Sequence, residues 1–137
     1  MRRRVSIARA LVDRPQIVFY DSPTAGLDPV TSQTIIILVL RRRDLEGVTS
    51  LLATHRVQDA FGLASFRLDR GSGKLVRVNG NRTHAAGVPV KAEGAAATNV
   101  LVLREGRVYF EGAAMEMLVS QDEYLKKFLE SAEPEQD

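Results

Sequence analysis

The chain has 137 residues, of which 45% are hydrophobic and 26% are charged, and its formal net charge is +2. This length allows a single domain with a core of its own. Because cysteine is absent, disulfides, thiolate metal sites and thiol nucleophiles are excluded. The longest strongly apolar run, Thr34 to Leu40, is too short to span a bilayer, so no direct membrane insertion is expected.

Two arginine triplets dominate the basic residues, Arg2 to Arg4 and Arg41 to Arg43. Clustered arginines can neutralise the phosphates of nucleic acids. Each triplet, however, lies in a predicted helix with acidic residues close by, and no aromatic residues alternate with the arginines to stack on bases. We therefore expect no nucleic-acid partner. No long apolar run follows the basic N-terminus, so we expect no signal peptide and a cytosolic location.

The first elements in chain order are a helix and a strand. Residues 2 to 13 carry apolar side chains at helical spacing, and Arg14-Pro15 ends that helix. Gln16 to Tyr20 is apolar after its first residue and too short for a helix. This pattern predicts a strand buried on both faces of a parallel sheet.

A second helix, strand and helix follow. Asp28-Pro29 supplies an N-cap and a proline at the first helical position, which predicts a helix to about Arg43 with Ile36 and Leu40 toward the core. Val48 to Thr54 is predicted as the next buried strand, and Val57 to Ala64 as a short helix. The alternation predicts an α/β fold with parallel strands and right-handed crossover helices.

The pattern then changes to hairpins. Gly71-Ser72-Gly73 separates the short strands Phe66 to Asp69 and Lys74 to Val78, and Arg104 to Gly106 separates Val100 to Leu103 from Arg107 to Phe110. A single helix from about Ala113 to Ser131 is expected to close the fold. The predicted organisation is a core over 1–65, an irregular insert with a hairpin over 66–99, a hairpin and helix of the same domain over 100–131, and a tail over 132–137.

The segment from Ile17 to Pro29 contains most of the residues that point to a chemical function. Asp21 ends an apolar strand, and a buried strand-end carboxylate needs compensation, which Mg²⁺ provides in phosphate-handling folds. Thr54-His55 ends the neighbouring strand, so an aspartate and a histidine should reach one sheet edge, where α/β proteins bind ligands.

These motifs resemble the second half of the nucleotide-binding domain of ATP-binding cassette (ABC) ATPases. Ser22 to Pro29 resembles the segment that joins Walker B to the D-loop, and Thr54-His55 resembles the switch histidine. Met1 to Leu11 resembles the helix that follows the LSGGQ signature, with Met1 in the place of the glutamine. The resemblance implies part of a P-loop NTPase fold that uses ATP and Mg²⁺.

The resemblance also implies roles for individual residues. Asp21 would hold the water shell of Mg²⁺, and His55 would contact the γ-phosphate and help to position the attacking water. Asp28, with Ala25 to Leu27, would contact a second ATPase subunit in a head-to-tail dimer. A membrane-spanning permease is the other implied partner, and it would place the chain on the inner face of the cell membrane.

Two departures from the family pattern stand out. Ser22 occupies the position where most members have the catalytic glutamate, and serine does not act as a base near neutral pH. No G-x-x-x-x-G-K-[ST] occurs, because Gly71 to Lys74 is followed by Leu75 and lies in a predicted hairpin. We therefore expect a C-terminal piece of the domain that does not bind ATP tightly and is inactive as an isolated chain.

The C-terminal run from Val108 to Leu129 bears a weaker resemblance to ATPase subunits of Mla-like, MCE-associated lipid importers. Three interpretations remain open from the sequence. The chain belongs to an energy-coupling ABC ATPase, or it is a degenerate, non-hydrolysing module for regulation or dimerisation, or it is an inert product of a truncated reading frame.

Overall fold

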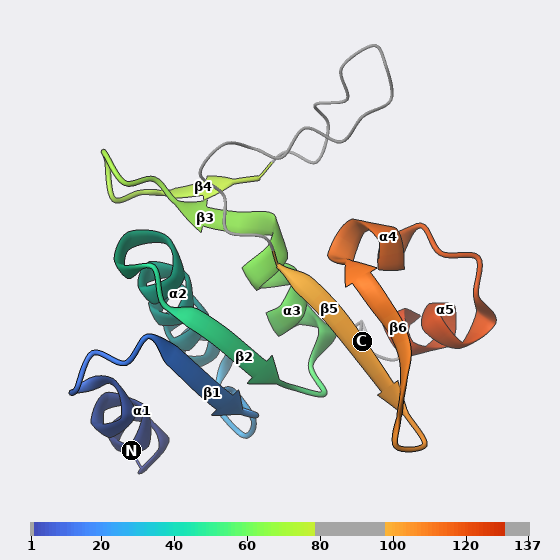
Figure 1. Cartoon of the computed structure of the whole chain (residues 1–137), viewed down its shortest axis with the longest axis horizontal. Helices are drawn as coiled ribbons and strands as arrows, with labels where there is room; N and C mark the ends of the chain where they lie inside the picture. The colour runs from blue at the N-terminus through green and yellow to red at the C-terminus, as the bar shows by residue number, and fades with distance from the viewer. Residues whose placement is uncertain (1, 79–97, 131–137) are drawn as a thin grey trace. The chain divides into compact units, whose positions relative to one another are not determined.

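A computed structural model of the chain describes residues 2–78 and 98–130 (Figure 1). Its elements are α1 (Arg2–Leu11), β1 (Ile17–Asp21), α2 (Pro29–Glu46), β2 (Thr49–Ala53), α3 (Val57–Ser65), β3 (Phe66–Leu68), β4 (Leu75–Arg77), β5 (Asn99–Arg104), β6 (Arg107–Ala113), α4 (Ala114–Leu118) and α5 (Glu123–Glu130). The chain is a mixed α/β protein in which β1 and β2 pair in parallel and β5 and β6 antiparallel. None of the helices in the described ranges is long and apolar enough to cross a membrane.

The chain divides into two compact units: Met1–His55 with Arg67–Val76, and Arg56–Phe66 with Arg77–Asp137. The predicted insert over 66–99 begins with the β3–β4 hairpin, and its residues 79–97 lie outside the described part, as does the predicted tail over 132–137. The elements from α1 to β6 appear in the predicted order, with ends that differ by a few residues.

In the first unit, α2 begins at Pro29 as predicted and ends at Glu46, three residues beyond the predicted end at Arg43. Asp28 caps its N-terminus, Pro29 is its first residue, and Gly47 follows its last turn with φ +70°, the left-handed conformation that glycine adopts easily. The helix buries Ile35, Val39 and Leu40, whereas Ile36 is only partly buried. Ile35 therefore takes the core position that we predicted for Ile36.

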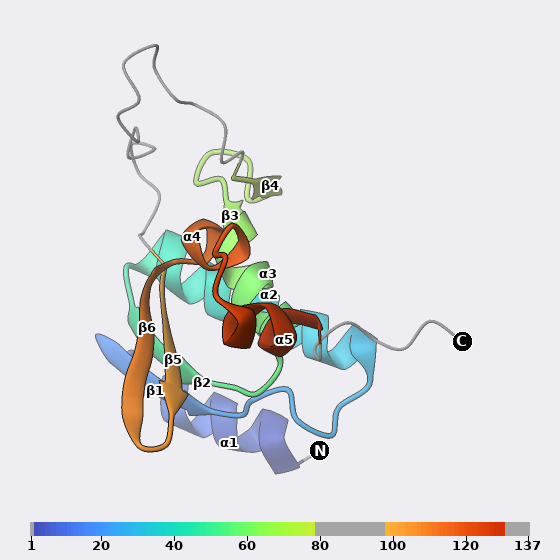
Figure 2. The same ribbon diagram turned by 90° about the vertical axis from the view of Figure 1, so that its right-hand side faces the viewer.

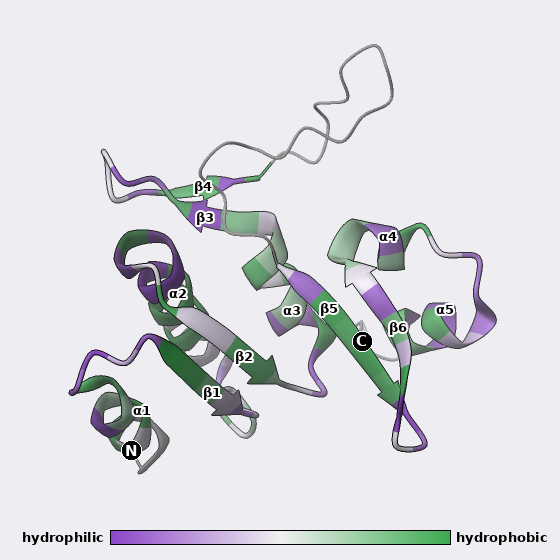
Figure 3. Ribbon diagram, in the orientation of Figure 1, coloured by the Kyte–Doolittle hydropathy of each residue, from purple (hydrophilic) through white to green (hydrophobic). Residues whose placement is uncertain are grey.

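The prediction that β1 is buried on both faces is wrong. Val18 and Tyr20 are buried, but Ile17 is 58% exposed and Phe19 is 75% exposed. The prediction of a buried strand is wrong for β2 too, because its Leu51, which pairs with Phe19, is 54% exposed. Alternate residues of a strand point to opposite faces, so one face of the pair is covered and the other is open in the described part. Figure 3 colours most of this strand as hydrophobic.

The exposed apolar face of β1 and β2 predicts that the purified chain self-associates. Exposed apolar side chains and free strand edges favour pairing between chains. Phe19→Thr should weaken association about tenfold or more, since a large side chain would no longer be buried on association. Concentration-dependent light scattering measures this effect. Val30→Thr, at a similarly exposed position on α2, is the control, and a monomeric wild-type chain would contradict the prediction.

A buried carboxylate ties the β3–β4 hairpin to α2 in the same unit. The Leu68 N–H donates to Asp44 Oδ2 at 2.8 Å, and Arg70 Nε donates to the Asp44 carbonyl at 2.9 Å. The Arg43 guanidinium also pairs with the Asp44 carboxylate. These partners offset the cost of burying a charge at the end of α2.

The second unit packs two helices against a hairpin. Val102 from β5, Met117 from α4 and Leu125 from α5 form its buried cluster. Figure 2 shows α4 and α5 on the same side of the β5–β6 hairpin. At the surface, Tyr109 donates to Asp122 at 2.7 Å, and the Arg104 guanidinium lies 4.3 Å from the centre of the Tyr124 ring.

The prediction of one closing helix from Ala113 to Ser131 is also wrong. The helix stops at Leu118 and a new one begins at Glu123. The Ser120 hydroxyl accepts from the Asp122 N–H, and Asp122 Oδ1 accepts from the Leu125 N–H at 2.9 Å. Short polar side chains that bond to the nearby backbone in this way interrupt one helix and cap the next.

Candidate functional site

The carboxyl ends of β1 and β2 bring the predicted site residues to one edge of the sheet. Asp21 pairs with Ala53 in the parallel register, and His55 follows Ala53 by two residues. The Ser22 N–H donates to the Ala53 carbonyl at 2.8 Å, which extends the pairing beyond the end of β1. Asp21, Ser22 and His55 therefore share the edge at which parallel sheets bind ligands.

Asp21 presents an accessible carboxylate. Its side chain is exposed, and the Ser22 hydroxyl donates to Asp21 Oδ1 at 3.3 Å. Among the side chains described, those of residues 5–78 and 98–130, it makes no ion pair, and no group of three or more acidic or histidine side chains could enclose a metal ion. A single exposed carboxylate fits a hydrated Mg²⁺ held through water, but it does not form a complete metal site.

His55 lies just beyond β2 with an exposed side chain. The described residues give its imidazole no hydrogen-bond partner. A neutral imidazole has one donor and one acceptor nitrogen, so both remain available for a ligand at this edge.

The loop from Ser22 to Asp28 is built from local turns. The Ala25 N–H donates to the Ser22 carbonyl at 3.2 Å, and the Leu27 N–H donates to the Thr24 carbonyl at 3.1 Å. Ser22 has φ +43° and Gly26 has φ +69°. A positive φ is strained in a residue other than glycine, so the turn that holds Ser22 beside Asp21 stores strain.

Thr24 is a buried residue of this loop that sequence reasoning missed. It is fully buried, although it lies in a loop of small residues. Its carbonyl accepts from the Leu27 N–H, so it forms part of the second turn of the loop. Its position between Pro23 and Gly26, two turn-forming residues, could have indicated that Thr24 lies in a tightly turned loop.

Asp28 lies at the far end of the loop and caps α2. Its Oδ1 accepts from the Thr31 N–H at 2.9 Å. The carboxylate is exposed, so the structure gives this residue a local role at the helix start. Hydrogen bonds from the side chain and the backbone N–H of Thr31 lower the pKa of Asp28 below its ordinary value of 3.8.

This shift predicts a pH dependence of stability. A carboxylate with a lowered folded-state pKa stabilises the fold fully above its unfolded pKa, and the contribution is lost as the pH falls through the folded value. Asp28→Asn keeps an N-cap acceptor but does not titrate. We therefore expect the wild-type advantage in Tm over this variant to shrink as the pH falls below 3.8. Thermal unfolding from neutral to acidic pH tests this, and a constant difference would contradict it.

Gly71 to Lys74 forms the turn of a hairpin, as predicted. Asp69 Oδ2 accepts from both the N–H and the hydroxyl of Ser72, at 2.8 Å each. The Asp69 N–H in turn donates to the Lys74 carbonyl. The backbone groups of this glycine-rich segment serve the turn, and the segment lies between two strands, so it does not have the strand-to-helix setting of a phosphate-binding loop.

Comparison with known proteins shows partial homology to ATP-binding proteins of ABC transporters. The chain is 34% identical to the phosphonates import ATP-binding protein PhnC of Thiobacillus denitrificans over 104 residues, which are 76% of this chain and 37% of that protein. It is 36% identical to the arginine transport ATP-binding protein ArtP of Haemophilus influenzae over 77 residues, 56% of this chain and 31% of that protein.

A third relative is the lipoprotein-releasing system ATP-binding protein LolD of Syntrophotalea carbinolica. It is 44% identical over 61 residues, 44% of this chain and 27% of that protein. The chain thus spans well under half the length of each of these relatives. No protein-family model matches it.

Proposed function

We propose that this chain contributes the Walker B, D-loop and switch-histidine segments of the ATP-binding subunit of an ABC transporter. The observation that carries the proposal is the parallel register of β1 and β2, which places Asp21 and His55 at one sheet edge. The homology to transporter ATP-binding proteins supports the same assignment.

The residues at the edge have complementary chemistry for this work. Asp21 would hold the water shell of Mg²⁺ with its exposed carboxylate, and His55 would contact the γ-phosphate through one imidazole nitrogen. Bound Mg²⁺ would neutralise charge on the phosphates. Because the 137 residues contain no Walker A motif, the amides and the lysine that cradle the phosphates would come from polypeptide outside them.

Partners and location follow from the same proposal. The loop from Ala25 to Asp28 would face a second ATP-binding subunit in a head-to-tail pair. A permease would hold the subunit at the cytoplasmic side of the membrane. The relatives are named for phosphonates, arginine and lipoproteins, so they support no single cargo, and the lipid assignment rests on the C-terminal sequence alone.

Ser22 favours a second candidate, a subunit that binds nucleotide without rapid turnover. Its hydroxyl donates to Asp21 and offers no base at the position of the usual glutamate. Such a subunit would regulate or complete a dimer whose other site carries out hydrolysis.

A chimera tests the first proposal. Residues 2–56 would replace the segment to which they align in the Thiobacillus denitrificans protein, which supplies the rest of an ATP-binding protein. We expect the chimera to bind Mg²⁺-ATP. Asp21→Asn should reduce the gain in ATP affinity that Mg²⁺ provides about tenfold, since residues that contact a metal's ligands rather than the metal itself have effects of about this size. Asp13→Asn, an exposed aspartate before β1, is the control. Equal Mg²⁺ dependence in both variants would refute the role of Asp21.

A further inference from the structure

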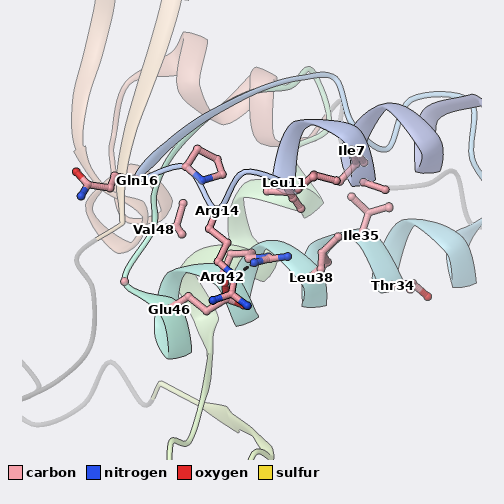
Figure 4. A pocket seen from close by; sticks show the side chains of 14 residues that line it. Ile7, Leu11, Arg14, Gln16, Thr34, Ile35, Leu38, Arg42, Glu46 and Val48 are labelled. Atoms are coloured by element: carbon pink, nitrogen blue, oxygen red, sulfur yellow. Dashed lines mark hydrogen bonds and ion pairs between the residues drawn. The ribbon is translucent and has the colours of Figure 1, made fainter.

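A large open groove lies between α1 and α2 in the first unit, and none of the residues of the proposed ATP site line it (Figure 4). Its volume is about 1120 Å³. Leu11 and Ile35 are buried and form its floor, and the partly exposed Ile7 on α1 and Leu38 on α2 face each other across it, so the lining is mainly apolar. The volume exceeds the range of about 300–1,000 Å³ typical of small-molecule sites, which favours a larger occupant.

The groove walls are helix ridges at regular spacing. Thr34, Leu38 and Arg42 line it from α2 in steps of four residues. Ala8 on α1 and Val12, in the turn that directly follows α1, line it from the other side, and both are exposed. Rows of residues spaced by four are the ridges against which another helix packs.

One end of the groove is positively charged. Figure 4 shows the Arg14, Arg42 and Glu46 side chains gathered there. Arg42 pairs with Glu46, whereas Arg14 makes no ion pair with any described residue. Two arginines and one glutamate leave one uncompensated positive charge, which a carboxylate on the occupant would neutralise.

We propose that this groove binds an amphipathic helix of a partner polypeptide, with an apolar stripe between α1 and α2 and a carboxylate beside Arg14. Helices of this kind bind grooves by burying side chains at helical spacing. The charge at one end sets the direction in which the helix lies. This inference concerns a surface other than the ATP site and does not depend on the proposed function.

The test uses the full chain and three synthetic peptides of about 15 residues, a length at which helices begin to be stable. The first has a leucine stripe and a glutamate at one end, the second replaces that glutamate by lysine, and the third scrambles the stripe. We expect the acidic peptide to bind about two- to fivefold more tightly than the basic one, the size of an exposed ion pair, and the scrambled peptide not to bind. Calorimetry measures the affinities.

Three variants make the test specific. Arg14→Glu should reverse the preference between the two peptides, whereas Arg9→Glu, an exposed position of α1 outside the groove, should leave it unchanged. Ala8→Trp should fill the groove and abolish binding. The chain has no other tryptophan, so fluorescence reports directly on the groove, and circular dichroism checks that the fold is kept.

Several results would overturn the proposal. Equal binding of acidic and basic peptides, no reversal in Arg14→Glu, or unchanged binding in Ala8→Trp would each do so. Dodecanoate serves as a small amphiphilic probe. If dodecanoate binds the wild-type chain but not Ala8→Trp, and no peptide binds either protein, the occupant is a small amphiphile and not a helix. If Ala8→Trp abolishes self-association of the chain in the absence of any peptide, the occupant of the groove is a second copy of the chain.

Discussion

Ser22→Glu should raise ATP turnover in the chimera by about 100-fold, because a general base contributes roughly 10²–10⁴-fold to rate. Ser22 follows Asp21 directly and lies at the same sheet edge as His55. A glutamate at this position would bring a carboxylate to the water that attacks the γ-phosphate. Steady-state phosphate release at saturating Mg²⁺-ATP measures the change.

The matched control is Ser22→Gln, which has the length of glutamate but no basic oxygen. Both residues must adopt the φ of +43° found at Ser22, so the backbone cost is the same and cancels in the comparison. We expect glutamine to leave turnover near that of serine. If the glutamate and glutamine variants turn over equally, or if the serine chimera already matches the parent protein, Ser22 does not limit hydrolysis.

Leu40→Ala should destabilise the chain by about 2–5 kcal/mol, the cost of removing a fully buried leucine and leaving a cavity. Leu40 is 1% exposed and lies in the core of the first unit. Domains are stable by about 5–15 kcal/mol in total, so this change removes a large part of the stability. Urea unfolding followed by circular dichroism measures the shift in midpoint.

Leu45→Ala provides the comparison on the same helix. Leu45 is 36% exposed, so truncating it should leave only a small cavity and a small shift. A Leu40 variant that loses no more stability than the Leu45 variant would show that α2 does not pack on this face in solution.

The sequence alone was sufficient for features that depend on neighbouring residues. Asp28-Pro29 and Gly47 bracket α2 because caps and a left-handed glycine act within one turn. Gly73 and Gly106 mark the hairpin turns for the same reason. The position of Asp21 and His55 at one sheet edge was equally visible, since each follows a short apolar strand.

Only the tertiary structure decided what depends on distant parts of the chain. The open face of Phe19 could not be predicted from an apolar strand, because burial depends on which layers cover it. The buried role of Asp44 arises from Leu68, 24 residues away. At the break before Glu123, Tyr109 donates to Asp122 Oδ2 while the Leu125 N–H donates to Asp122 Oδ1, and helical periodicity alone does not reveal the contact from Tyr109, which lies 13 residues earlier. Helix caps and turns are determined by residues a few positions apart, whereas the burial of a side chain and its long-range contacts depend on residues far away in the sequence.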